Sequence, residues 1–100
     1  MVKHIVLWKL KDFAEGANKQ ENARKIKTML EDMRGKIPGM LKLEVGLNYE
    51  RSNDAADISL YTEFESRAAL DAYQLHPAHM PAKKFIPLVR TERRVADYDA

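Results

Sequence analysis

The sequence contains no cysteine, and its 100 residues include only four glycines, four prolines and one tryptophan. The lack of cysteine excludes disulfides, thiolate metal sites and cysteine nucleophiles together, and it fits a reducing compartment, so we expect a cytoplasmic protein. Charge of one sign does not dominate either, because seventeen Lys and Arg residues oppose fifteen Asp and Glu and leave a net charge of +2. So small a surplus does not attract nucleic acid strongly, and no nucleic-acid partner is expected.

Long apolar runs are also missing. The apolar stretch at the N-terminus, residues 1–9, is too short and too closely flanked by lysine to span a bilayer or to serve as a signal peptide, so we expect a soluble protein without a membrane partner. One hundred residues suit a single domain over residues 1–100. Basic residues gather late in the chain, and without a nucleic-acid motif beside them they indicate a solvated face or a local anion contact: Lys83, Lys84, Arg90, Arg93 and Arg94.

Alternating side chains predict four strands. In the first strand Ile5 and Leu7 point away from Val6 and Trp8, so both faces are apolar at its centre and both need cover. The predicted strands are residues 2–11, 41–49, 56–64 and 93–98.

Helical spacing of apolar residues predicts a helix over residues 19–34, with Asn18 as its N-cap and Gly35 as its C-terminal stop. Ser66 can cap a second helix, which ends at the His76–Pro77 bend because proline disfavours the helical conformation in the residue before it. Two further segments are less regular, and we expect a loop over residues 12–18 and a short irregular helix followed by a loop over residues 80–88.

The order strand, helix, strand, strand, helix, strand suits an α+β fold, a ferredoxin-like four-stranded antiparallel sheet with both helices on one face. No helix is left to cover the other face, where Ile5 and Leu7 would form an exposed hydrophobic patch. Packing two sheets face to face in a twofold dimer removes that patch. We therefore expect a homodimer through the sheet face.

Two of the three histidines fall within four residues, in the segment Tyr73-x-x-His76-Pro77-x-His79. Imidazole titrates near neutral pH and phenol donates a hydrogen bond without ionising, a pairing suited to moving protons on a bound molecule. A histidine cap and a packed tyrosine explain the same spacing in structural terms. A metal site that joins His76 and His79 with Asp97 or His4 is a further alternative, although Pro77 breaks the helical face that the two histidines would share.

Four pieces of sequence together are similar to the stress-responsive A/B barrel, or Dabb, domain family over essentially the whole chain. They are residues 2–11, Ile37-Pro38-Gly39 with Gly46, the Tyr73 to His79 segment, and Asp97-Tyr98. The resemblance implies a dimeric α/β barrel. Many members of this family have no known activity and are linked only to stress responses.

One plant member of the family closes a polyketide chain by an intramolecular aldol condensation, without a metal or an organic cofactor. Matched residue by residue, the resemblance implies His79 as general base and Tyr73 as its assistant, with His4 lining the same pocket. If the first strand's His4 face meets the helices, the pocket would be apolar and would take a small apolar or aromatic ligand. Its expected lining, beside the three catalytic candidates, is Trp8, Val6, Leu30 and Phe85.

Three functions therefore stay open. The first is a homodimer of unassigned role in a stress response, with His4 and His79 as structural groups in a core that binds at most a small ligand. The second is a cofactor-independent cyclase or lyase, with His79 as base, Tyr73 as oxyanion donor and His4 as the group that orients them. The third is a divalent-metal-binding, haem-binding or monooxygenase-like barrel.

Overall fold

The computed structural model describes all residues from Met1 to Ala100. No helix in it has the length and apolar character needed to cross a membrane. The elements in chain order are β1 (Val2–Leu10), β2 (Phe13–Ala14), β3 (Ala17–Asn18), α1 (Lys19–Glu31), β4 (Met40–Leu47), β5 (Ile58–Phe64), α2 (Arg67–Gln74), the single 3₁₀ turn η1 (Pro77–His79), α3 (Met80–Val89) and β6 (Arg90–Asp99).

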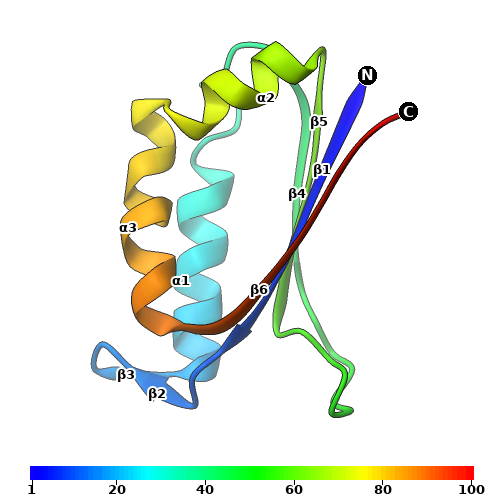
Figure 1. The fold of residues 1–100 in the computed structure, drawn as a ribbon. Helices are drawn as coiled ribbons and strands as arrows, with labels where there is room; N and C mark the ends of the chain where they lie inside the picture. The colour runs from blue at the N-terminus through cyan, green and yellow to red at the C-terminus, as the bar shows by residue number, and fades with distance from the viewer.

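The main sheet has the strand order β4-β5-β1-β6, and every neighbouring pair is antiparallel. The helices all lie on one side of it, with α1 and α3 side by side and α2 across one end (Figure 1). The predicted fold is thereby confirmed, a ferredoxin-like α+β layer. Because β1 is an inner strand, its residues from Val2 to Trp8 have partners on both sides, and His4 pairs with Thr62 of β5 and Asp97 of β6.

The two faces of β1 have different surroundings. Val6 and Trp8 are buried with His4 under the helices, and they join Ile26 and Leu30 of α1 in one hydrophobic core. The alternate residues of β1 face away from the helices. The strand register places the following side chains together on this open face: Ile5, Leu7, Tyr61, Ala96 and Tyr98.

The predicted helix caps are confirmed. The Asn18 side chain accepts a hydrogen bond from the Glu21 N–H at 2.9 Å, and Ser66 accepts one from the Ala69 N–H at 3.1 Å. The first helix is shorter than predicted, since α1 ends at Glu31 and Gly35 lies in the turn beyond it.

Two predicted irregular segments are in fact ordered. The expected loop over residues 12–18 contains the small β2–β3 hairpin, whose tight turn is made by Glu15 and Gly16, both at positive φ. The expected irregular helix and loop are instead the regular helix α3, followed at once by β6. Pro81 lies in the first turn, where its missing N–H is not needed. Pro87 lies inside the helix, where it removes one helical hydrogen bond, and the helix ends two residues later. As a result β6 begins at Arg90, three residues before the predicted strand.

Candidate active site

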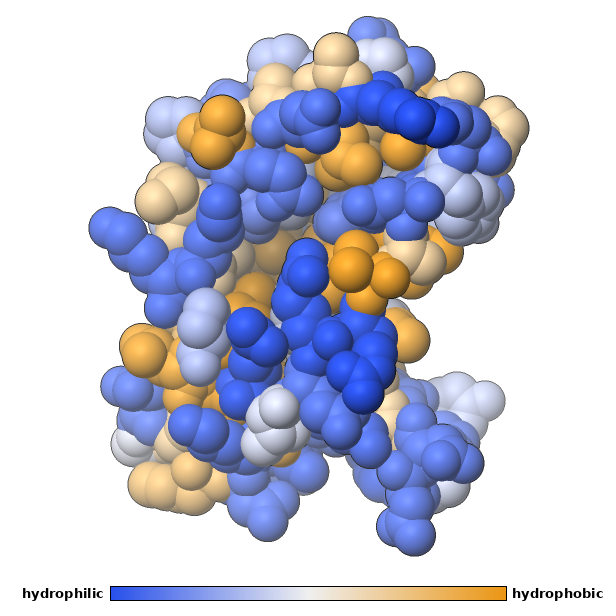
Figure 2. Space-filling model, viewed as in Figure 1, coloured by the Kyte–Doolittle hydropathy of each residue, from blue (hydrophilic) through white to orange (hydrophobic).

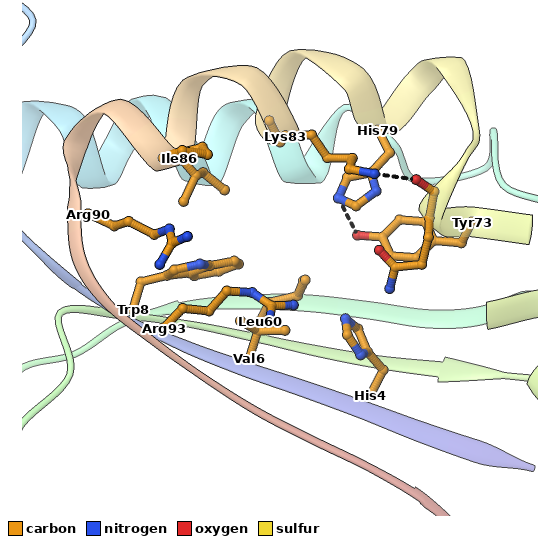
Figure 3. A pocket seen from close by; sticks show the side chains of 13 residues that line it. His4, Val6, Trp8, Leu60, Tyr73, His79, Lys83, Ile86, Arg90 and Arg93 are labelled. Carbon is orange, nitrogen blue, oxygen red and sulfur yellow. Dashed lines mark hydrogen bonds between the residues drawn. The ribbon is translucent and has the colours of Figure 1, made fainter. Parts of the chain in front are cut away.

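A cavity of about 270 Å³ lies between the sheet and the layer formed by α2, η1 and α3. Side chains from β1 and β6 face side chains from the helices across it (Figure 3). The three catalytic candidates from the sequence, His4, Tyr73 and His79, all line this cavity. The structure therefore brings together three residues that are up to 75 positions apart in the chain.

Tyr73 and His79 form one unit. Tyr73 lies near the end of α2, and η1 turns the chain so that the His79 ring stacks on the phenol, with 4.1 Å between ring centroids and 13° between planes. The Tyr73 hydroxyl and His79 Nε2 are 3.2 Å apart (Figure 3). His76 is the N-cap of η1, and its Nδ1 accepts a hydrogen bond from the Ala78 N–H at 3.0 Å. Of the two histidines in the segment, His76 thus has the structural role.

Burial keeps both members of this unit uncharged at neutral pH. Tyr73 is 1% exposed, and burial raises its pKa well above the ordinary value for a phenol. Burial first, and the charge of Lys83 second, lower the pKa of His79 to about 4. His79 Nδ1 is buried without a hydrogen-bond partner, and Nε2 contacts Tyr73.

His4 has a partner that the sequence did not reveal. Its Nδ1 lies 2.5 Å from Asp97 Oδ1, and the imidazole is 2% exposed. The carboxylate accepts a hydrogen bond from Nδ1–H, which fixes the tautomer and leaves the Nε2 lone pair free. The His4 ring centroid lies 6.0 Å from that of Tyr73. The sequence offered Asp97 only as a possible metal ligand. Its pairing with His4 was missed because that pairing depends on the β1–β6 register, which alternation within each strand does not set.

The four residues expected to line the pocket lie in different places. Val6 and Trp8 line the cavity, whereas Leu30 and Phe85 do not. Leu30 is fully buried in the core, and Phe85 lies on α3 beneath the Lys25 ammonium, 5.0 Å from its ring centroid. Helix α3 presents other residues to the cavity: Ala82, Lys83, Ile86 and Pro87.

Three basic residues complete the lining. They are Lys83 of α3 together with Arg90 and Arg93 of β6, three of the five cations for which the sequence indicated a solvated face or a local anion contact. No three His, Asp or Glu side chains come close enough together to hold a metal ion. The metal alternative that joined His76 and His79 therefore has no ligand set in this arrangement.

Comparison with solved structures places the fold among small dimeric proteins. A dimeric protein of unknown function with a ferredoxin-like fold from Bacteroides fragilis is 32% identical, with 99% of this chain and 95% of that chain covered and a TM-score of 0.82. A dimeric ferredoxin-like protein of unknown function from Thermobifida fusca has a TM-score of 0.85 at 19% identity, covering 99% and 90% of the two chains.

A third structure of the same fold is an enzyme, the hydroxynitrile lyase from Passiflora edulis. It has a TM-score of 0.76 at 20% identity, covering 97% of this chain and 90% of that chain. Identity this low shows the shared fold alone. Among proteins of curated function, none matches the sequence.

The family itself is decided by a match over almost the whole chain. The model of the Stress responsive A/B Barrel Domain family covers residues 2–100. The matched range includes both strands that carry His4 and Asp97 and the segment from Tyr73 to His79. The chain belongs to the stress responsive A/B barrel (Dabb) domain family.

Proposed function

We propose that this protein is a cofactor-independent enzyme of the lyase or cyclase type, which moves a proton on a carbon beside a carbonyl group of a small molecule. The observation that carries the proposal is the pairing of His4 with Asp97 on one side of the cavity, facing the Tyr73–His79 unit on the other. Enolisation requires a base beside the α-carbon and a hydrogen-bond donor beside the carbonyl oxygen of the same compound.

His4 is the proposed base. Asp97 holds its Nδ1–H, so Nε2 is the nitrogen with a free lone pair, and His4 lines the cavity. The carboxylate also stabilises the imidazolium that forms when Nε2 takes a proton. His79 is less suited to this step, because its Nδ1 is buried and its Nε2 contacts Tyr73. This division of roles differs from the one that the family resemblance implied, in which His79 is the base.

Tyr73 is the proposed oxyanion donor and His79 its positioning residue. If His79 Nε2–H donates to the Tyr73 oxygen, the phenol O–H is free to donate to a substrate oxygen. In the reaction, the carbon beside the carbonyl group loses a proton to His4 Nε2. The electron pair of the broken C–H bond is delocalised onto the carbonyl oxygen, which gives the enolate, and Tyr73 stabilises the new negative charge on that oxygen. The enolate then recovers a proton or attacks a second carbonyl group, which forms a carbon–carbon bond. The hydroxynitrile lyase from Passiflora edulis supports the proposal by analogy, since the same fold there carries a lyase.

The test is solvent exchange of protons beside a carbonyl, followed by ¹H NMR in D₂O on a panel of aryl ketones and keto acids. We expect the wild-type protein to accelerate exchange on at least one compound class. Loss of a general base costs about 10²–10⁴-fold, so His4→Gln should reduce the rate by at least about 100-fold. Tyr73→Phe should cost about 10²–10³-fold, as for other oxyanion donors.

A matched histidine variant serves as control. His76→Asn removes an imidazole three residues from His79 but keeps a residue able to cap η1, so exchange should persist. If His79→Gln abolishes exchange while His4→Gln does not, His79 is the base and our assignment is wrong. If no compound exchanges faster with the protein than without it, the cavity is a binding site or a structural feature and the enzyme proposal fails.

A further inference from the structure

The cavity has an excess of positive charge that no carboxylate within it balances. Lys83, Arg90 and Arg93 line it, and no Asp or Glu does. None of the three takes part in a salt bridge, although other pairs of opposite charge, such as Arg67 with Asp99, do. The Lys83 ammonium donates only to the backbone carbonyl of Gln74, at 2.7 Å (Figure 3).

Arg90 lies at one end of the cavity beside Trp8, and the Tyr73–His79 unit lies at the other end (Figure 3). The Arg93 side chain runs from the Trp8 end toward His4 (Figure 3). Arg93 stands opposite Trp8 in the β1–β6 register and therefore projects from the helix side of the sheet. Arg90 is half-buried and Arg93 is exposed at the mouth. Figure 2 shows a hollow in this face, between the helix layer and β6, where hydrophobic atoms lie behind a border of strongly hydrophilic residues.

The charge of Arg93 reaches the reactive end. Burial raises the pKa of Tyr73, and the Arg93 charge lowers it by a smaller amount. Burial, the Lys83 charge and the Arg93 charge all lower the pKa of His79. A ligand whose negative group is held by Arg93 would therefore have the adjoining carbons near His4 and Tyr73.

We propose that the substrates of this cavity are small aromatic keto acids, with the carboxylate held by Arg90 and Arg93 and the ring in the apolar part of the cavity. Guanidinium groups match the planar fork of a carboxylate, and an ion bound there meets no competing acidic side chain. A cavity of about 150 Å³ suffices for benzene, so the volume of about 270 Å³ leaves room for a ring and a short keto-acid chain. This assignment rests on the proposed function, because it places the enolisable carbon beside His4 and Tyr73.

The experiment compares phenylpyruvate with phenylacetone, which has the same ring and ketone but no carboxylate. Calorimetric titration of the wild-type protein should show at least tenfold tighter binding of phenylpyruvate. Arg90→Gln and Arg93→Gln should each weaken phenylpyruvate binding by at least tenfold and leave phenylacetone binding unchanged. Arg24→Gln is the control, since Arg24 lies exposed on α1, away from the cavity, and its loss removes the same charge. It should affect neither ligand.

Proton exchange on both compounds separates this proposal from the proposed function. Equal binding of the two compounds, with exchange that still needs His4, overturns the keto-acid assignment and leaves the enzyme proposal intact. Arginine-dependent binding of phenylpyruvate without His4-dependent exchange overturns the enzyme proposal and leaves the two arginines as a binding site for the carboxylate. Tighter binding of phenyl phosphate than of phenylpyruvate, or no binding of phenylpyruvate at all, also overturns the keto-acid assignment.

Discussion

At the scale of single residues, His79 couples the stability of the fold to pH. Burial and the nearby Lys83 charge lower its pKa from 6.5 to about 4. Between these two values the unfolded chain binds a proton at this position and the folded chain does not. Stability should therefore fall as the pH drops through this window, and His79 should contribute no further loss below the folded pKa.

We predict that the wild-type protein loses stability between pH 7.5 and pH 5 and that His79→Gln loses less. The full pKa shift would correspond to roughly 2 kcal/mol by pH 5. Because His79 is only partly buried, screening by solvent should reduce this to about 1 kcal/mol. Urea unfolding of both proteins at the two pH values measures the difference. His76→Asn should behave as the wild type, and an identical pH dependence in His79→Gln would show that another group is responsible.

At the scale of elements, the turn that contains Gly39 packs tightly against α2. Gly39, in the turn that leads into β4, has φ +79°, and a Cβ atom there would lie 2.6 Å from Ala69 Cβ on α2. Its carbonyl also accepts a hydrogen bond from the Glu65 N–H at 2.9 Å, just before α2 begins. The position therefore requires glycine both for its backbone conformation and for space.

Gly39→Ala should lower the free energy of unfolding by about 2–4 kcal/mol, which combines positive-φ strain with overpacking. Gly35→Ala is a matched control, because Gly35 has φ +80° but no atom within 4 Å of the added Cβ. It should cost only the strain, about 1 kcal/mol. Urea midpoints of the two variants give the comparison, and equal losses would mean that α2 shifts freely to accept the methyl group.

The contrast between local and non-local contacts also explains how much of the structure was predictable. Asn18 and Ser66 were found as caps because each bonds to a residue three positions on. The pairing of His4 with Asp97 spans 93 positions and follows from a strand register that neither strand encodes alone. The two prolines of α3 argued against a regular helix, so the sequence did not show which of its side chains face the cavity. Phe85 was therefore expected to line the cavity, where Ile86 lies instead.

At the scale of the whole molecule, the open face of the sheet remains to be explained. It carries Ile5 and Tyr61 near its centre, and Leu7 is 40% exposed. No helix covers this face, which lies on the side of the sheet away from α1 and α3 (Figure 1). The similar proteins from Bacteroides fragilis and Thermobifida fusca are described as dimeric. We propose that two copies of this chain pack through their open faces, which would close the barrel after which the family is named.

Leu7→Glu tests this arrangement, because it places a charge in the middle of the proposed interface, where an unpaired buried carboxylate is costly. Light scattering during size exclusion should give the mass of a dimer for the wild type and of a monomer for the variant. Leu75→Glu introduces the same charge at a leucine that is 81% exposed at the end of α2, and it should stay dimeric. A dimeric Leu7→Glu protein would place the interface elsewhere. Since His4 and Leu7 lie on opposite faces of β1, a folded Leu7→Glu monomer should still bind ligand in the cavity. Loss of ligand binding in that monomer would show that closing the barrel holds β6 and its Asp97 in register with His4.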